Sequence, residues 1–136
     1  MIKGIAHAAL IVNDMEKTVE FYDKNFGFKK SFELADKDGN PWIIYLKIAD
    51  GQFLELFYPK VSFEPKPMWK SEGFAHLCFE VEDINEIADH LKKNGIVLDV
   101  EPSRGADLNY QCWTHDPDGN AIELMQMSPD SPQLQG

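Results

Sequence analysis

The chain begins with an apolar run that gives way to an amphipathic segment. Residues 5–12, IAHAALIV, have the composition of a buried strand. In residues 15–26 the apolar side chains recur at helical spacing, with Asp14 placed to cap a helix and Gly27 to end it. The recurring positions are Val19, Tyr22 and Phe26. The pattern predicts a strand followed by a helix.

Three strand-like segments follow this helix. Residues 28–35 and 41–49 flank DKDGN, a sequence typical of a hairpin turn. Asp50 and Gly51 form another turn signal before the strand-like residues 52–58. The first part of the chain is therefore predicted to have the order β-α-β-β-β.

The same pattern occurs a second time. His7 in GIAHAAL recurs as His76 in GFAHLCF, 69 positions later, and DGQFLEL at 50–56 recurs as DGNAIEL at 118–124, with an offset of 68. The other recurring positions of the first match are Gly4, Ala6, Val12, Asp14, Lys24 and Asn25. Two matches with nearly equal offsets, one near each end of a unit, indicate a duplication.

The second copy predicts the same elements. Its first strand covers 73–82, and Asp83 caps a helix that runs through residue 94 and ends at Gly95. Further strands are expected near 96–101, 109–115 and 120–127.

The chain is therefore interpreted as two tandem βαβββ modules, residues 1–58 and 73–127, of the α+β class. Residues 59–72 contain three prolines and no clean hydrophobic period, which is typical of a linker, and residues 128–136 are expected to form a frayed tail. Neither module alone can bury both faces of a curved four-stranded sheet. The two are expected to pack together or against another chain.

Composition and charge narrow the possible partners. The 136 residues, 43% of them hydrophobic, suffice for one compact domain. A net charge of −10 argues against nucleic acid or an anionic membrane as partner. There is no apolar run of about 18 residues and no secretion-signal layout at the start. Cys78 and Cys112 are interpreted as buried residues of a reducing compartment, so we expect a cytoplasmic protein.

Each module contains two polar residues within apolar strands. Glu55 lies in FLELF and Glu123 in AIELM, and burying a carboxylate without a partner is costly. His7 and His76 lie in similar surroundings. Taken singly, each residue has a simpler explanation: a core histidine bonded to a neighbouring carbonyl, or a strand glutamate that faces solvent.

Taken together, the four residues predict a metal site, because the duplication gives them symmetric positions. Two imidazoles and two carboxylates around a divalent cation form a formally neutral set and remove all four burial penalties. The predicted ligands are His7, Glu55, His76 and Glu123. Their types suit zinc, nickel, cobalt, iron or manganese. His90 and His115 have no counterpart in the other module and are interpreted as non-ligands.

At these residues the chain resembles the vicinal oxygen chelate superfamily, the glyoxalase/bleomycin-resistance/dioxygenase group. The resemblance covers residues 3–127 and is carried by GIAHAALIVNDMEKTVEFYDKNFGF, FLEL, GFAHLCFEVEDI and DPDGNAIELM. It implies two modules whose eight strands form a curved, cup-shaped mixed sheet around a metal. The His-Glu-His-Glu set is most similar to bacterial glyoxalase I (lactoylglutathione lyase)-like proteins. Nickel or zinc is the expected metal, with cobalt, manganese and iron as alternatives.

This resemblance implies proton transfer on a carbon beside a carbonyl, through an enediolate that the metal stabilises. The substrate would be the methylglyoxal–glutathione hemithioacetal or a related α-oxo compound. Glu123 is the expected base and Glu55 its symmetric counterpart, and the sequence alone does not separate them. Short bacterial glyoxalases carry an arginine and an asparagine that serve glutathione; here Ile11 replaces the arginine, and LFYP follows Glu55 without the asparagine.

Three other functions stay open at this point. They are a metal-dependent epimerase or isomerase of another carbonyl compound, a non-catalytic small-molecule binder of the drug-resistance type, and an iron oxygenase. We expect a homodimer with ligands from both chains, although the cup can also close within one chain.

Several further side chains are candidates for contact with a small-molecule substrate. They are Trp42, Tyr45, Tyr110, Trp113 and Arg104. The aromatic residues could line the cup, and Arg104 could pair with an anionic substrate group. Ordinary core packing and a solvated loop arginine are the simpler interpretations.

Overall fold

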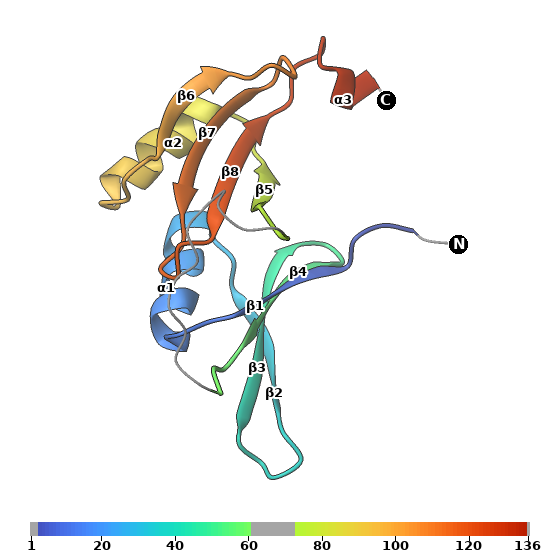
Figure 1. Cartoon of the computed structure of the whole chain (residues 1–136), viewed down its shortest axis with the longest axis vertical. Helices are drawn as coiled ribbons and strands as arrows, with labels where there is room; N and C mark the ends of the chain where they lie inside the picture. Colours follow the sequence, from blue (N-terminus) through green and yellow to red (C-terminus); the bar gives the residue numbers. More distant parts are fainter. Residues whose placement is uncertain (1–2, 61–72, 136) are drawn as a thin grey trace. The chain divides into compact units, whose positions relative to one another are not determined.

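The structure, a computed structural model, describes residues 3–60 and 73–135. The chain divides into two compact units (Figure 1), here called the first module (3–60) and the second module (73–135). Most of the predicted linker, residues 61–72, lies outside the described residues. The predicted module boundaries therefore stay predictions.

The first module contains one helix and four strands. They are β1 (His7–Ile11), α1 (Met15–Phe26), β2 (Lys30–Ala35), β3 (Pro41–Ala49) and β4 (Gln52–Phe57). Every element begins and ends within two residues of its predicted range. The order βαβββ is confirmed for this module.

The second module repeats that order and adds a short helix. Its elements are β5 (His76–Glu80), α2 (Ile84–Lys93), β6 (Val100–Arg104), β7 (Tyr110–His115), β8 (Ala121–Gln126) and α3 (Pro132–Gln135). The agreement with the predicted ranges is close except at β6, which was expected near 96–101.

The shift of β6 has a physical reason in how its preceding residues are bonded. The Asp99 amide donates to the Trp113 carbonyl at 2.7 Å, where pairing with β7 begins. Before that point the Val97 carbonyl accepts from the Thr114 hydroxyl, at 2.9 Å, instead of from a backbone amide. The apolar run after α2 therefore approaches the sheet without joining its ladder, and the strand starts later than the composition suggests.

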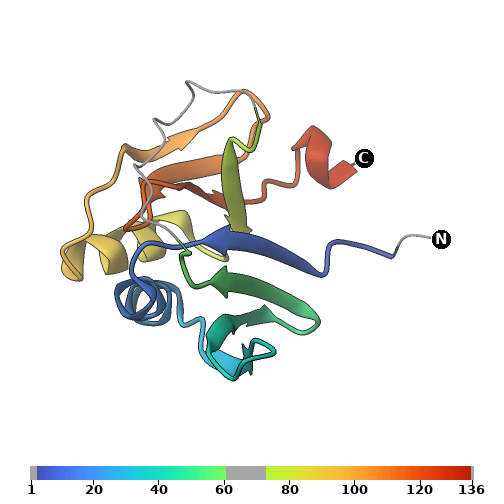
Figure 2. The ribbon, with the colours of Figure 1, turned by 60° about the horizontal axis from the view of Figure 1, so that its bottom comes forward.

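Each module folds into one four-stranded mixed sheet, with strand orders β1-β4-β3-β2 and β5-β8-β7-β6. The first strand of each module pairs in parallel with the last, as Figure 2 shows for β1 beside β4, and the hairpin-connected strands are antiparallel. The α+β class and the tandem modules are confirmed. That the two sheets join into one eight-stranded cup stays a prediction.

Alternation along the central strand of each sheet separates a core face from a second face. The strand residues that flank the two candidate glutamates are fully buried: Leu54, Leu56, Ile122 and Leu124. Because successive side chains of a strand point to opposite faces, Glu55 and Glu123 lie on the face away from these core residues. The fold thus assigns the apolar and the polar residues of FLELF and AIELM to different faces.

The helix α1 is bounded as the sequence predicts. The Asp14 carboxylate accepts a hydrogen bond from the Lys17 amide at 3.0 Å, which satisfies one of the free amides of the first turn. Gly27 ends the helix in the left-handed region, at φ 72°. A side chain would be strained there, which is why glycine suits this position.

The helix α2 is capped more fully. The Asp83 carboxylate accepts from two amides, those of Asn85 at 2.8 Å and Glu86 at 3.0 Å. The helix ends at Asn94 and packs against β6, β7 and β8 of its own sheet. Within the described residues, no helix is long and apolar enough to cross a membrane.

The C-terminal segment, residues 128–135, is docked on the second module, so the predicted frayed tail was wrong. Asn109, fully buried at the start of β7, explains the docking. Its side-chain oxygen accepts from the Ser128 amide at 2.9 Å, and its amide nitrogen donates to the Gln133 side chain at 3.2 Å. A buried amide satisfied by the tail ties the tail to the sheet.

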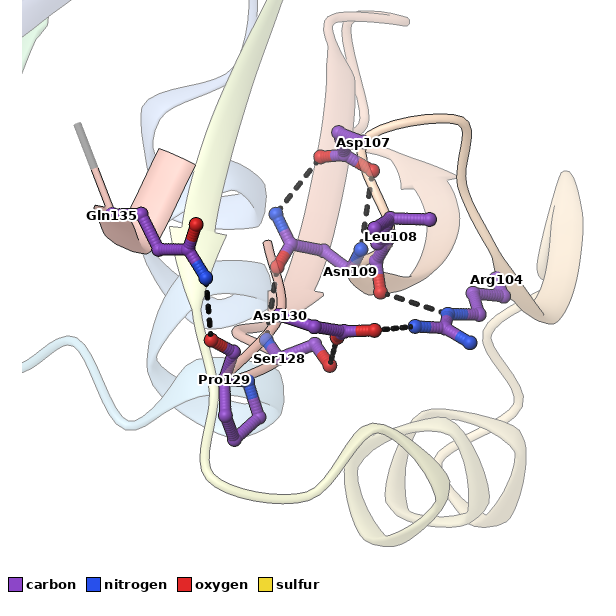
Figure 3. Close-up of polar contacts among 8 residues, drawn as sticks. All are labelled: Arg104, Asp107, Leu108, Asn109, Ser128, Pro129, Asp130 and Gln135. Atoms are coloured by element: carbon purple, nitrogen blue, oxygen red, sulfur yellow. Dashed lines mark hydrogen bonds and ion pairs between the residues drawn. The ribbon is translucent and has the colours of Figure 1, made fainter. Parts of the chain in front are cut away.

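Arg104 adds a charged contact to the same segment, as Figure 3 shows. Its guanidinium donates to the Asp130 carboxylate at 2.6 Å and to the Leu108 carbonyl at 3.0 Å. The hydroxyl of Ser128 and then the guanidinium stabilise the charged carboxylate, so the pKa of Asp130 is lowered. Arg104 is the last residue of β6 and not a loop residue, and its half-exposed side chain is paired with Asp130.

Candidate metal-binding site

The first module brings His7 and Glu55 together. His7 begins β1 and Glu55 lies in the middle of β4, where its register partner is Ala9, two residues after His7 on the same face. Residues at such diagonal positions of neighbouring strands can touch when their side chains are long. The His7 Nε2 atom lies 3.4 Å from Glu55 Oε2.

The second module repeats this arrangement with His76 and Glu123. Glu123 in β8 pairs with Cys78 in β5, again two residues after the histidine. The His76 Nε2 atom lies 3.1 Å from Glu123 Oε2. The duplication seen in the sequence is therefore also a duplication of side-chain geometry.

These two distances fit a pair of ligands of one cation. Ligands about 2.1 Å from a metal, seen at angles between about 90° and 109°, lie about 3.0–3.4 Å apart. A direct hydrogen bond explains the first module poorly, because 3.4 Å is long for N–H···O. Each module thus presents a nitrogen and an oxygen at the spacing of two metal ligands.

Burial makes the two carboxylates depend on a partner. The side chains of Glu55 and Glu123 are 9% and 7% exposed, whereas those of His7 and His76 reach further out, at 46% and 30%. A carboxylate buried this far needs hydrogen bonds or a positive charge to offset its loss of solvation. A divalent cation beside each pair would supply the compensation.

The two modules differ in what lies opposite the glutamate. Tyr45 in β3 is the register partner of Glu55, and its hydroxyl donates a hydrogen bond to Glu55 Oε1. The pKa of Tyr45 is raised, first because this hydrogen bond holds the phenol proton, then by desolvation and by the negative charge of Glu55. Trp113 holds the corresponding place opposite Glu123 and packs edge-on against His76, with ring centroids 4.8 Å apart.

Cys78 was predicted to be a buried structural residue, but it is exposed, whereas Cys112 is buried as predicted. Cys78 lies next to Glu123 on the second module's sheet. Partial desolvation of the thiol, together with the nearby carboxylate, raises the pKa of Cys78 to about 12. Its thiol therefore stays protonated at neutral pH.

The structure brings the predicted ligands together as pairs within each module. Among residues 3–60 and 73–135, no group of three or more His, Cys, Asp and Glu side chains is close enough to hold a metal ion. What is brought together is one histidine–glutamate pair in each module. The full set of four stays a prediction.

The other candidate residues lie outside these pairs. His115 pairs with Asp99 at 2.8 Å, and His90 contacts Asn94 at 3.1 Å on α2. Tyr110 lies under the Arg104 guanidinium, at 5.9 Å from its ring centre.

A hollow of about 450 Å³ in the first module is separate from the pairs. Trp42 and Tyr58 line it together with the β2–β3 hairpin, and none of the four candidate ligands does.

Sequence reasoning named Tyr45 only as a possible wall of the cup. Its hydrogen bond to Glu55 depends on the register of β3 against β4, which was not predicted from the sequence. The turn signal Asp50-Gly51 alone would set Leu46 opposite Glu55, and a register shift between Lys47 and Ala49 brings Tyr45 there instead.

The comparison with protein families is decisive for classification. The sequence profile of the Glyoxalase/Bleomycin resistance protein/Dioxygenase superfamily matches residues 4–124. The chain belongs to this superfamily. The predicted resemblance is therefore confirmed, and superfamily members commonly bind divalent metals.

Individual relatives are similar over most of their length. The "Virulence protein STM3117" of Salmonella typhimurium is 29% identical over 93% of this chain and 85% of the relative. Its crystal structure aligns with a TM-score of 0.68 at 30% identity, over 94% of this chain and 99% of the other.

Two further relatives carry enzyme names. A "Probable lactoylglutathione lyase" of Vibrio cholerae is 27% identical over 97% of this chain and 96% of the relative. An "Ethylmalonyl-CoA/methylmalonyl-CoA epimerase" of Cereibacter sphaeroides is 27% identical over 93% of this chain and all of the relative, 100%.

Proposed function

We propose that this protein is a divalent-metal-dependent lyase or isomerase of the glyoxalase I type. It moves a proton on a carbon beside a carbonyl of a small α-oxo substrate. The observation that supports this most strongly is the repeated histidine–glutamate pair, at 3.4 Å in the first module and 3.1 Å in the second. The relatives named as lactoylglutathione lyases agree with it.

The proposed ligands are the two repeated pairs, His7 with Glu55 and His76 with Glu123. The donor set fits a transition metal, because two imidazole nitrogens and two carboxylate oxygens suit nickel or zinc and leave positions for substrate oxygens. When bound, such a cation supplies Lewis-acid stabilisation of the negative charge that develops on the substrate oxygen.

The protein's own residues would move the proton. Glu123 is the proposed base, and it takes a proton from the carbon beside the carbonyl and returns it to the neighbouring carbon. Its low exposure, 5%, keeps bulk water from competing for that proton. Glu55, which already accepts a hydrogen bond from Tyr45, is proposed to stay in place.

A complete site requires one pair from each type of module. We propose that two copies of the chain form a homodimer and exchange modules across the interface, so that each site takes ligands from both chains. Closure within a single chain is the alternative, and a mixture of two inactive variants separates them. One variant is His7→Ala and the other is His76→Ala, so each has one damaged module. Mixing the two restores activity only if a site combines the intact module of one chain with the intact module of the other.

The first experiment measures metal content and turnover together. Elemental analysis of purified protein should find a transition metal in stoichiometric amount, and methylglyoxal with glutathione should yield lactoylglutathione. His76→Ala should lose the metal, whereas His115→Ala, a matched change in the same module, should keep it. Bound metal without turnover would remove this substrate and keep the site, and absence of metal binding would contradict the proposal.

A second candidate function is epimerisation of a different carbonyl compound, such as a CoA thioester. It is favoured by Ile11, an exposed apolar residue (58%) where short bacterial glyoxalases carry an arginine that serves glutathione. The relative named ethylmalonyl-CoA/methylmalonyl-CoA epimerase also agrees with it. Deuterium incorporation from solvent into candidate thioesters, without glutathione, would distinguish this activity from glutathione-dependent turnover.

A further inference from the structure

The two glutamates have different neighbours on the adjacent strands: Ala9 and Tyr45 lie beside Glu55, and Cys78 and Trp113 lie beside Glu123. Tyr45 and Trp113 occupy equivalent register positions opposite Glu55 and Glu123. Only the tyrosine of this pair carries an oxygen that can donate to a carboxylate. The duplication therefore retained the ligand geometry while changing how each carboxylate is held.

The two carboxylate oxygens of Glu55 have different partners. Oε1 accepts from the Tyr45 hydroxyl, and Oε2 faces His7 Nε2 at 3.4 Å. An oxygen that already accepts a hydrogen bond is a poorer second ligand, so the contact favours binding of a cation through Oε2 alone. The bond also fixes the rotation of the carboxylate, which is otherwise free about its terminal torsion.

The tyrosine ring is itself held in place by neighbours on the same face. It stacks on Phe32 with centroids 4.3 Å apart and meets His7 and Phe53 edge-on at 6.3 and 6.2 Å. A donor fixed by three rings presents its hydroxyl in one position. Tyr45 therefore also bounds the space in which the His7 imidazole can move.

We propose that Tyr45 is a positioning residue that fixes Glu55 as a one-oxygen metal ligand. This inference rests on the proposed function. It gives the first module's carboxylate a fixed orientation through a hydroxyl that Trp113, the register counterpart of Tyr45 in the second module, does not carry. Tyr45 acts through Glu55 and does not contact the reacting atoms.

The test is cobalt(II) binding to Tyr45→Phe, a change that removes the hydroxyl and keeps the ring. Metal-free protein is titrated with cobalt(II), and affinity and the visible spectrum are recorded. We expect about 10- to 100-fold weaker binding, the usual cost of losing a group that orients a ligand, together with a changed spectrum as the carboxylate turns. Tyr58→Phe, the same chemical change beyond the end of β4, should bind cobalt(II) as the unaltered protein does.

The outcomes separate this inference from the proposed function. If the unaltered protein binds no cobalt(II), the metal site and this inference both fail. If it binds cobalt(II) and Tyr45→Phe matches it in affinity and spectrum, only the role of Tyr45 is overturned. Thermal melting of the metal-free variants shows whether each one folds, and a lower melting temperature with unchanged binding would mean that the hydroxyl only stabilises the fold.

Discussion

The two modules share their architecture and differ in how tightly individual parts are held. Both have the βαβββ order, the same sheet topology and one histidine–glutamate pair. The first module fixes its glutamate with a tyrosine hydroxyl, whereas the second caps its helix with two hydrogen bonds and binds its C-terminal segment through Asn109. Duplication thus preserved the histidine–glutamate pair of each module, and divergence altered its surroundings.

The turns between the second and third strands of each module illustrate the same divergence. Both close with equivalent backbone hydrogen bonds, Gly39 N to Asp36 O and Leu108 N to Gly105 O. The residue in the left-handed region is Gly39 in the first module, at φ 85°, and Leu108 in the second, at φ 70°. A leucine there costs about 1 kcal/mol or more. The second module accepts this strain at the turn where Arg104 bonds the Leu108 carbonyl.

The largest expected effect concerns the two glutamates. At saturating metal, Glu123→Gln should lower turnover by about 10²- to 10⁴-fold, because the proposed base is lost. Glu55→Gln should act mainly by weakening metal binding. Steady-state kinetics over a range of metal concentrations measures both. Equal losses for the two variants at saturating metal would contradict the assignment of different roles.

Equivalent core leucines test whether the modules share one folding transition. Leu56→Ala and Leu124→Ala each remove a fully buried side chain next to a candidate glutamate, and each should lower the free energy of unfolding by about 2–5 kcal/mol. Because neither sheet can bury both of its faces alone, we expect a single denaturant transition that shifts in both variants. Two transitions, each affected by one variant only, would show that the modules unfold independently.

The helix starts should differ by a smaller amount. Removing the carboxylate of an N-cap costs about 1 kcal/mol. Asp83→Ala should cost more than Asp14→Ala, because Asp83 accepts from two amides and Asp14 from one. Chemical denaturation of the two variants gives the comparison, and an equal or reversed cost would show that the second hydrogen bond of Asp83 adds nothing.

The smallest effect concerns acid release of the C-terminal segment. The pKa of Asp130 is lowered below its ordinary value of 3.8, so its ion pair with Arg104 contributes fully above that pH. The contribution is lost as the pH falls from 3.8 through the lowered pKa of the folded state. The protection factor of the Gln135 amide, measured by NMR across this range and corrected for intrinsic exchange, should fall with acid. In Asp130→Asn the acid-dependent part of that fall should disappear.

Local chemistry accounts for the parts of the fold that the sequence predicted well. The caps Asp14 and Asp83 and the turn at DKDGN act within a few residues, so their signals lie close together in the chain. Because the sequence repeats, the elements predicted for one module were also expected in the other. The repeated motifs around His7, Glu55, His76 and Glu123 also carried the resemblance to the superfamily.

Non-local contacts account for what was missed. Asn109 meets Ser128 across 19 positions, and no local pattern indicates that a polar tail will satisfy a buried amide. The start of β6 depended on a side chain of β7, which composition does not reveal. The histidine–glutamate pairs were predicted as residues, but joining both pairs on one cation depends on how the modules meet, which the repeat does not specify.

Every β ladder among the described residues joins strands of one module, since β1 pairs with β4 and β5 with β8. Backbone pairing within each sheet therefore does not depend on which module comes first in the chain. A circular permutant that places the second half ahead of the first would keep each sheet and each half-site intact. Two separate genes, one for each half, could in the same way supply the parts for reassembly.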